Sequence, residues 1–237
     1  MRSLILFTLL LGSFPLTGSP PPTSPDGYGF RFIRIQYTGV PYSRGYTWAY
    51  DYPTAERNLY EAIDRTTNIH LEGEPLVLTL TDPRIFEYPV LYLCEPGYWL
   101  TNDDEVKNLQ KYFARGGFMI IDDFHDWGGK SGREWSNFYY NIKQVFPDRE
   151  PVELSPDHPI WSIYYDIDPI EAESTKRGFG KYADEYYGIF DDDGRLMCVI
   201  CYNQDIGDGW EWPGNLAEAS TVSFQMAINF IMYALTH

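Results

Sequence analysis

Short apolar runs alternate along this chain with segments in which apolar residues recur every three or four positions. Runs of four to eight apolar or β-branched residues, bounded by turn residues, are typical of strands. They predict strands at residues 30–37, 76–80, 90–94, 118–121, 186–190 and 196–202. The last two are joined by Asp192-Asp193-Gly194, a sequence that favours a hairpin turn.

Helical spacing predicts helices at residues 54–65, 133–145 and 220–235, and one that runs from Asn102 to the glycine pair at 116–117. Asn102 is a favourable N-cap, and Asp103 and Asp104 would lie at the positive end of the helix dipole. The proline-rich residues 146–169 are predicted to form an extended surface excursion.

Strands that alternate with helices predict an α/β fold. We expect a three-layer sandwich, with a mainly parallel sheet, helices on both of its faces and a β-hairpin in the C-terminal half. The 237 residues suffice for one large domain, and the sequence shows neither an internal repeat nor a change of composition. Residues 28–237 are therefore predicted to form a single domain.

Polar residues arrive abruptly where the strand at 118–121 ends. Asp122, Asp123 and His125 follow four apolar residues directly. In open α/β sheets, ligands bind outside the carboxyl ends of the strands. The sequence therefore predicts a site around these three residues.

The overall charge excludes one class of partner. The formal net charge is −16 and the sequence pI is about 4.5. A field of this sign repels phosphate backbones, so no nucleic acid partner is expected. Aromatic residues are 17% of the chain, which supplies many rings for packing or binding.

The N-terminal residues resemble an export signal. Arg2 is followed by an apolar run at residues 4–11 and by small residues as far as Ser19. The run is too short to span a bilayer and matches a cleaved signal peptide at 1–19, with an uncleaved anchor as the alternative. Residues 20–27 form a Pro/Ser-rich leader. We expect an exported, periplasmic or secreted protein with no transmembrane helix in the mature chain.

Cys198 and Cys201 form a C-x-x-C motif, which elsewhere indicates redox or metal chemistry. Here the motif lies in a predicted strand, where residues three apart point to opposite faces, roughly 10 Å from each other. A disulfide needs Cα atoms within about 7 Å. We therefore interpret the pair as two small apolar residues that face two layers; a cross-strand disulfide of one of them with Cys94 stays open.

Several short motifs occur in an order that resembles a bacterial family known only as domain of unknown function 4159. They are Asp51-Tyr52-Pro53 with Asn58, Tyr88-Pro89, Gly116-Gly117 with Asp122-Asp123, Phe146-Pro147, Asp157-His158-Pro159, and Ala227-Ile228-Asn229 with Tyr233-Ala234. The resemblance covers nearly the whole mature chain. It implies a flavodoxin-like sandwich of the class I glutamine-amidotransferase-like group, without an agreed activity.

One departure bears on catalysis. The resemblance implies a glycine-rich turn after the third strand, and this chain has Cys94-Glu95-Pro96-Gly97 there. Amidotransferases of this group place a nucleophilic cysteine on a tight turn after a strand, but Cys94 comes one strand too early. After Ile121, where that turn would fall, the chain has carboxylates and no thiol. We therefore expect no working amidotransferase nucleophile.

Four residues are candidates for catalysis: Asp122, Asp123, His125 and His158. Carboxylates and imidazole suit divalent cations, so Asp123, His125 and Asp205 are the candidate metal ligands, with Asp126 or His158 as further options. In the alternative interpretation, one aspartate caps a helix or turn and the other is solvated. His158 has a similar alternative, in which it bonds to the main chain and fixes its loop. No cofactor is predicted beyond this possible divalent metal.

Loop aromatics and polar groups add candidates for ligand binding. They are Tyr37, Trp48, Glu95, Trp99, Asn203 and Asp205. Trp127, Trp210 and Trp212 also fall in predicted loops. Flat rings stack on sugars and other ligands, but they equally often fix loops onto a domain as small cores.

Together these features predict an exported, non-catalytic protein that binds a polar small molecule or an envelope protein in a cleft at the strand ends. The first alternative is a metal-assisted or acid/base hydrolase that acts on carbohydrate or amide substrates. The second is an assembly module that uses an exposed aromatic surface. The sequence has no phosphate-binding loop, no dinucleotide-binding glycine pattern and no Gly-x-Ser-x-Gly motif.

Overall fold

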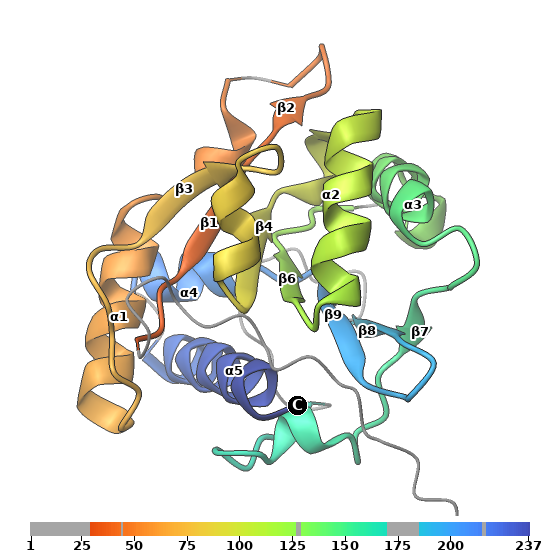
Figure 1. Ribbon diagram of the computed structural model, residues 1–237. Coiled ribbons are helices and arrows are strands. Elements are labelled where there is room, and N and C mark those ends of the chain that lie inside the picture. The colour runs from red at the N-terminus through yellow and green to blue at the C-terminus, as the bar shows by residue number, and fades with distance from the viewer. Residues whose placement is uncertain (1–28, 44, 127–128, 170–184, 215–216) are drawn as a thin grey trace, which may run out of the picture.

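A computed structural model describes residues 29–43, 45–126, 129–169, 185–214 and 217–237. The predicted signal peptide and leader lie outside these residues. Within them the main sheet has seven strands in the order β3-β1-β4-β6-β9-β8-β7 (Figure 1). The strands are β1 (Ile33–Gln36), β3 (Leu76–Thr79), β4 (Val90–Cys94), β6 (Phe118–Asp122), β7 (Val152–Glu153), β8 (Glu185–Phe190) and β9 (Leu196–Tyr202). A second, two-stranded sheet joins β2 (Thr38–Gly39) to β5 (Trp99–Leu100).

The first five strands of the sheet are parallel, and β8 and β7 extend it in antiparallel pairing. Counted along the chain, the parallel strands have the flavodoxin-like order 2-1-3-4-5. The connections reverse direction between β1 and β4. In such sheets the crevice at this switch point, outside the carboxyl ends of the strands, is the usual ligand position.

Helices cover both faces of the sheet (Figure 1). On one side lie α1 (Thr54–Thr66), α4 (Ile206–Glu211) and α5 (Ala217–Thr236); on the other lie α2 (Asp103–Ala114) and α3 (Arg133–Val145). The connections contain the 3-10 helices η1 (Thr47–Ala49), η2 (Pro83–Glu87), η3 (Pro96–Tyr98), η4 (Gly129–Ser131) and η5 (Pro159–Trp161). These layers confirm the predicted α/β sandwich.

Each strand of the sheet supplies both cores, because successive side chains point to opposite faces. In β4, Val90 and Tyr92 pack in the core under α1 and α5, whereas Leu91 and Leu93 pack under α2 and α3. The C-x-x-C motif follows the same rule. Cys201 belongs to the first core and Cys198 to the second, and both cysteines are buried and free. The structural interpretation of this motif is confirmed, and Cys94 forms no disulfide.

Most predicted elements are confirmed, including the N-cap of α2, where Asn102 and Glu105 form a capping box. The predicted surface excursion at 146–169 is wrong in part. Its β7 joins the sheet beside β8, and Ile160 and Trp161 are buried in the core near α5. Apolar side chains in a proline-rich segment therefore form a small extension of the core here. The short helix α4 was not predicted, because Ile206-Gly207-Asp208-Gly209 has low helix propensity.

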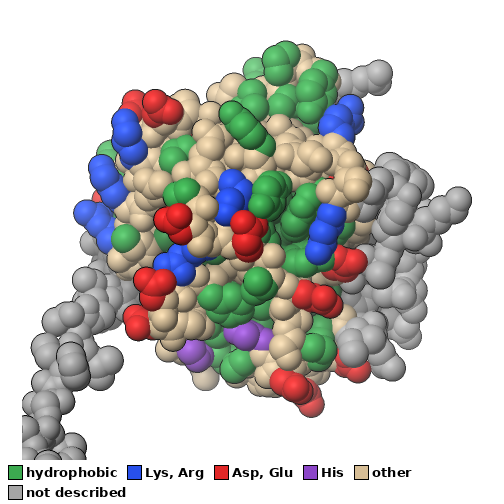
Figure 2. Space-filling view, turned by 90° about the vertical axis from the view of Figure 1, so that its right-hand side faces the viewer, with side chains coloured by type: hydrophobic (Ala, Val, Ile, Leu, Met, Phe, Trp, Pro, Cys, Tyr) green, Lys and Arg blue, Asp and Glu red, His purple; other side chains and the backbone are tan. Residues whose placement is uncertain are grey.

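The surface that Figure 2 shows does not gather the acidic charge in one place. Lys and Arg side chains are interspersed there with Asp and Glu and with hydrophobic groups (Figure 2). Among the described residues, moreover, no helix combines the length and the hydropathy that a membrane crossing requires.

A buried ion pair connects the sheet to α1. Arg34 on β1 and Glu56 on α1 are 0% and 1% exposed, and the guanidinium donates to the Glu56 carboxylate. Its Nη1 also donates to the main-chain oxygen of Trp48 at 2.9 Å, and its Cζ lies 4.8 Å from the centre of the Tyr92 ring. Burial lowers the pKa of Arg34, but the charge of the Glu56 carboxylate and its hydrogen bond to the guanidinium contribute to a net upward shift. The guanidinium therefore stays charged inside the core.

Replacing Glu56 with leucine should leave this charge buried and uncompensated. We expect the free energy of unfolding to fall by about 3–5 kcal/mol in a urea titration. The double variant Arg34→Met/Glu56→Leu removes both charges and should recover a large part of the loss. A single variant as stable as the double variant would contradict the role assigned to the pair.

Candidate functional site

Four residues other than glycine have a positive φ among the described residues, and three of them directly follow parallel strands. Glu95 follows β4 (φ 52°), Asp123 follows β6 (φ 71°) and Asn203 follows β9 (φ 57°); the fourth, Asp51, precedes α1 (φ 63°). This conformation is uncommon outside glycine, costs on the order of 1–3 kcal/mol and concentrates at functional sites. It turns the chain sharply where each strand ends.

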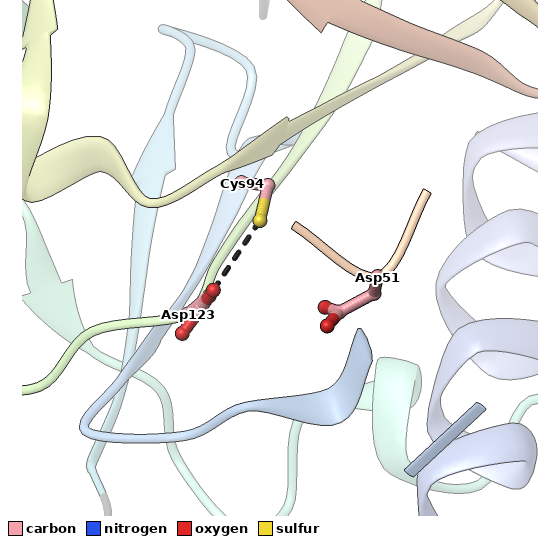
Figure 3. A group of neighbouring side chains, drawn as sticks. All are labelled: Asp51, Cys94 and Asp123. Carbon is pink, nitrogen blue, oxygen red and sulfur yellow. Dashed lines mark hydrogen bonds between the residues drawn. The ribbon is translucent and has the colours of Figure 1, made fainter. Parts of the chain in front are cut away.

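Asp123 lies at the centre of the polar groups at these strand ends. Its Oδ2 accepts a hydrogen bond from the Cys94 thiol at 3.3 Å (Figure 3), and its Oδ1 lies 3.1 Å from His125 Nδ1. The carboxylate is 2% exposed, whereas the His125 side chain is 25% exposed. The five residues Asp51, Cys94, Glu95, Asp123 and His125 are called the strand-end cluster below.

Glu95 contributes a buried carboxyl group to the cluster. The residue is 6% exposed, and its Oε2 has no hydrogen-bond partner among the described residues. One of its carboxylate oxygens lies close to an oxygen of Asp123 and to a ring nitrogen of His125, and these three atoms are all within 4.8 Å of one another. Three groups that bind cations or protons thus converge on one point.

Asp51 faces Asp123 from the other side, as Figure 3 shows. An oxygen of Asp51, the Cys94 sulfur and an oxygen of Asp123 also lie within 4.8 Å of one another. The close fit depends on Gly207 at the start of α4, because a Cβ there would lie 2.7 Å from Asp51 Oδ2. Sequence reasoning did not propose Asp51 as a site residue, although Asp51-Tyr52-Pro53 was one of the motifs behind the family resemblance.

Burial makes these carboxyl groups hard to ionise together. Burial, followed by the charge of Asp123, raises the pKa of Glu95 to about 10 and that of Asp51 to about 8. For His125, burial lowers the pKa, but the hydrogen bond to Asp123 and its charge outweigh burial, so the net shift is upward. The cluster therefore favours protons or another source of positive charge.

The thiol of Cys94 does not have the properties of a nucleophile. It is 0% exposed, and burial followed by the charge of Asp123 raises its pKa well above the ordinary value. A reactive cysteine needs access and a thiolate, which a positive environment stabilises. Cys94 instead orients Asp123 by donating a hydrogen bond to it.

Asp122, a predicted catalytic candidate, caps a helix, as the alternative interpretation held for one of the two aspartates, but the helix is distant in the sequence and Asp123 is buried, not solvated. Its carboxylate accepts hydrogen bonds from the Tyr92 hydroxyl at 2.8 Å and from the main-chain N–H groups of Ile206 and Gly207 at 3.2 and 3.0 Å. It therefore caps the N-terminus of α4 from within the core. Burial and the charge of Asp123 nevertheless raise its pKa to about 7.

Replacing Asp122 with alanine should leave these donors unsatisfied. We expect a loss on the order of 3 kcal/mol in the free energy of unfolding, measured by denaturant titration. Asp122→Asn retains one acceptor oxygen and should lose less. Equal stability of the alanine variant and the unaltered protein would exclude this capping role.

Of the predicted ligand-binding residues, some lie at or near the strand-end cluster and others are buried in the core. Tyr37 and Glu95 are in contact, since the Tyr37 hydroxyl donates to the Glu95 main-chain oxygen at 2.7 Å. Trp48 lies in η1, and its ring contacts those of Tyr46 and Tyr52. Trp99, by contrast, is 0% exposed within the core on the α2–α3 side, so it offers no surface to a ligand.

Asn203 and Asp205 each accept a main-chain hydrogen bond through Oδ1, although Asn203 Nδ2 has no partner among the described residues. Asn203 Oδ1 accepts from the N–H of Asp126 at 3.0 Å, and Asp205 Oδ1 accepts from that of Asp208 at 2.8 Å as the N-cap of α4. Asp205 belongs to none of the groups of potential metal ligands found among the described residues. Metal ligation by Asp205 is therefore not favoured, because its carboxylate caps a helix instead.

The predicted loop aromatics also separate. Trp210 is fully buried and belongs to α4, not to a loop as predicted, while Trp212 is 50% exposed. Trp127 lies outside the described residues. In general, the predicted cleft residues are more buried than an open cleft implies. The cluster reaches solvent through His125 and Asp51, which are partly exposed.

The structure does not bring His158 to the cluster. It is the N-cap of η5, where Nδ1 accepts from the N–H of Ile160 at 3.2 Å, and its ring contacts Phe190 and Tyr233. Phe190 pairs with Leu196 at the start of β9. His158 therefore lies at the amino ends of the parallel strands, away from the strand-end cluster. His158 fixes its loop, as the alternative interpretation held. Burial and the charge of His237 lower its pKa.

This lowered pKa predicts a pH effect on stability. The unfolded chain binds a proton at His158 more readily than the folded chain, so stability falls as the pH drops below 6.5, the ordinary pKa of histidine. His158→Asn retains a cap acceptor and cannot titrate. We expect its thermal midpoint to fall less than that of the unaltered protein between pH 7 and pH 5. Parallel curves for the two proteins would refute the effect.

The structure also has a hollow of about 680 Å³ near the amino ends of β6 and β9, away from the strand-end cluster. It is lined in part by Arg115, Arg149 and Arg195. These cations are engaged: Arg149 pairs with Asp192 at 2.8 Å, Arg195 pairs with Asp191 at 3.1 Å, and Arg115 lies over the Phe86 ring. The hollow therefore presents mostly neutralised charge. The strand-end cluster is the stronger candidate site.

Comparison with known protein families identifies one family for this chain. The family model for the domain of unknown function DUF4159 matches residues 31–235. The match begins just before β1 and extends to the last turn of α5, so it contains the whole strand-end cluster. No curated protein matches the chain.

Proposed function

The chain belongs to the DUF4159 family, and we propose that it is an exported binding protein for a polar ligand. The ligand brings positive charge or hydrogen-bond donors to the strand-end cluster. The buried carboxyl group of Glu95, whose Oε2 has no hydrogen-bond partner among the described residues, is the observation that carries this proposal.

A buried polar atom without a partner costs about 1–3 kcal/mol, and more when it is charged. A ligand that donates to Glu95 removes this cost on binding, so the unsatisfied group favours the bound state. The position fits as well, since Glu95 follows β4 at the switch point between β1 and β4. Location, burial and lack of a partner thus support the same site.

Exposed rings beside the cluster support a ligand with cationic or sugar-like groups. Tyr50 is 44% exposed and close enough to Glu95 and Asp123 for their charges to raise its pKa, although burial is the larger cause. Tyr46 and Tyr52 are 76% and 39% exposed, and both rings contact Trp48. Aromatic faces attract cations and stack on sugar rings.

Export is the second element of the proposal. It is supported by Arg2, the apolar run at residues 4–11 and the small residues that follow. The placement of the family in the amidotransferase-like superfamily likewise stays a prediction, supported by the strand order.

A hydrolase is the second candidate, favoured by one contact. His125 Nδ1 lies 3.1 Å from Asp123 Oδ1, and an imidazole paired with a carboxylate is an arrangement used for acid–base catalysis. Release of product from chromogenic glycosides or amides, lost in His125→Asn, would move the assignment to this alternative.

Thermal-shift titrations of the tag-free mature chain with spermidine and glucosamine test the binding function. We expect at least one of these probes to stabilise the protein, and Tyr50→Ala to weaken its binding about 3- to 30-fold through loss of a cation–π or stacking contact. Tyr140→Ala is the matched control, because Tyr140 is 67% exposed on α3.

Equal losses of probe affinity in Tyr50→Ala and Tyr140→Ala would show that the probe does not bind beside the strand-end cluster. The proposal fails if neither probe stabilises the protein and native mass spectrometry finds no small molecule bound to the protein as purified.

A further inference from the structure

We infer that Glu95, Asp123 and His125 hold one divalent transition-metal cation, such as Zn²⁺ or Mn²⁺. This inference rests on the proposed function, because the cation would occupy the same site and supply the positive charge that the site favours. The inference identifies the ligand, or one component of it, as a divalent metal cation.

The three donors are arranged for a shared ion. One atom from each residue lies within 4.8 Å of the other two, so a modest side-chain rotation brings all three to bonding distance. Asp123 is held by the Cys94 thiol at 3.3 Å, and the main-chain N–H of His125 donates to Glu134 Oε2 at 2.6 Å. Supporting contacts of this kind orient metal ligands and strengthen binding.

Glu95 provides an independent indication of a ligand. The residue is 6% exposed, its Oε2 has no hydrogen-bond partner among the described residues, and its carboxyl group faces Asp123 and His125. An isolated buried carboxylate is costly, and metal coordination is one of the few ways to compensate it. Since Oε2 breaks no hydrogen bond when it moves, Glu95 is free to close on the ion.

The donor types select the metal. Carboxylate oxygens alone suit Mg²⁺ and Ca²⁺, whereas an imidazole nitrogen favours Zn²⁺ and other transition metals. Three protein ligands leave coordination positions open for water or for a polar ligand, as in catalytic zinc sites. The His125 side chain is 25% exposed, so the ion and its further ligand can reach the site from solvent.

Two other groups of donors are weaker candidates. Asp51, Cys94 and Asp123 share a carboxylate with the proposed site, but Cys94 would have to release its proton at a position that is 0% exposed. Asp51, Asp208 and Glu211 are all partly exposed acidic groups. Asp123 Oδ1 and Asp51 Oδ2 also lack a hydrogen-bond partner among the described residues, but Asp123 is shared with the proposed site and Asp51 is only partly buried, whereas Glu95 is 6% exposed.

Native mass spectrometry and calorimetry on the tag-free mature chain, stripped with a chelator, test the inference with ZnCl₂, MnCl₂ and MgCl₂. We expect one Zn²⁺ or Mn²⁺ per chain and weaker binding of Mg²⁺. Glu95→Gln and His125→Asn should each weaken binding at least 10-fold. Glu153→Gln, which removes the same charge at an exposed position on β7, should leave binding unchanged. Circular dichroism verifies that each variant is folded.

Absence of a stoichiometric cation, or equal affinity in Glu95→Gln and the unaltered protein, overturns the inference. A loss of metal affinity in Asp51→Asn, without such a loss in Glu95→Gln, also overturns the inference. It would assign the ion to the neighbouring donors Asp51, Cys94 and Asp123. Spermidine titrations in the presence of chelator separate the two proposals. Spermidine binding that Glu95→Gln weakens, without binding of any metal ion, would leave the proposed function standing and reject the metal.

Discussion

The geometry of the strand-end cluster depends on the buried guanidinium of Arg34. From β1 it binds the main-chain oxygen of Trp48 and the carboxylate of Glu56, which lie on either side of Asp51 in the sequence. These two contacts fix the segment that carries Asp51 against the sheet, so that Asp51 faces Asp123. Because the Arg34 charge is neutralised largely by Glu56, it leaves the cluster itself with an excess of acidic groups.

The parallel pairing of β4 and β6 positions the other two acidic residues of the strand-end cluster, Glu95 and Asp123. Cys94 and Asp122 are paired residues at the ends of adjacent strands, so Glu95 and Asp123 leave the sheet side by side. Left-handed conformations at both residues turn their chains at once and hold the two carboxyl groups close together. Repulsion between them is the cost of this geometry, and the structure compensates only part of it through Cys94 and His125. A cationic ligand would compensate the rest.

Local patterns in the sequence predicted the five parallel strands, β8 and the four longer helices, and they indicated a candidate site at the strand ends, but they did not predict α4 or the two-residue strands β2, β5 and β7. The run at 118–121 followed by Asp122, Asp123 and His125 needs only the rule for strand ends. It did not separate Asp122 from Asp123, since the donors that Asp122 satisfies come from α4, more than 80 residues away. The roles of His158, Asp205 and Trp210 could not be decided from the sequence for the same reason: a polar or aromatic residue in a loop-like sequence gives no sign of what the fold packs against it.

The central claim is that the strand-end cluster binds a cation between Glu95, Asp123 and His125. Anomalous X-ray diffraction from crystals of the mature protein grown with Zn²⁺ or Mn²⁺ tests it most directly, because the peak locates the ion independently of any assay. The account predicts one strong peak within about 2.0–2.3 Å of an atom from each of the three residues. A difference map without a peak there, or with peaks only at exposed surface groups, would contradict it.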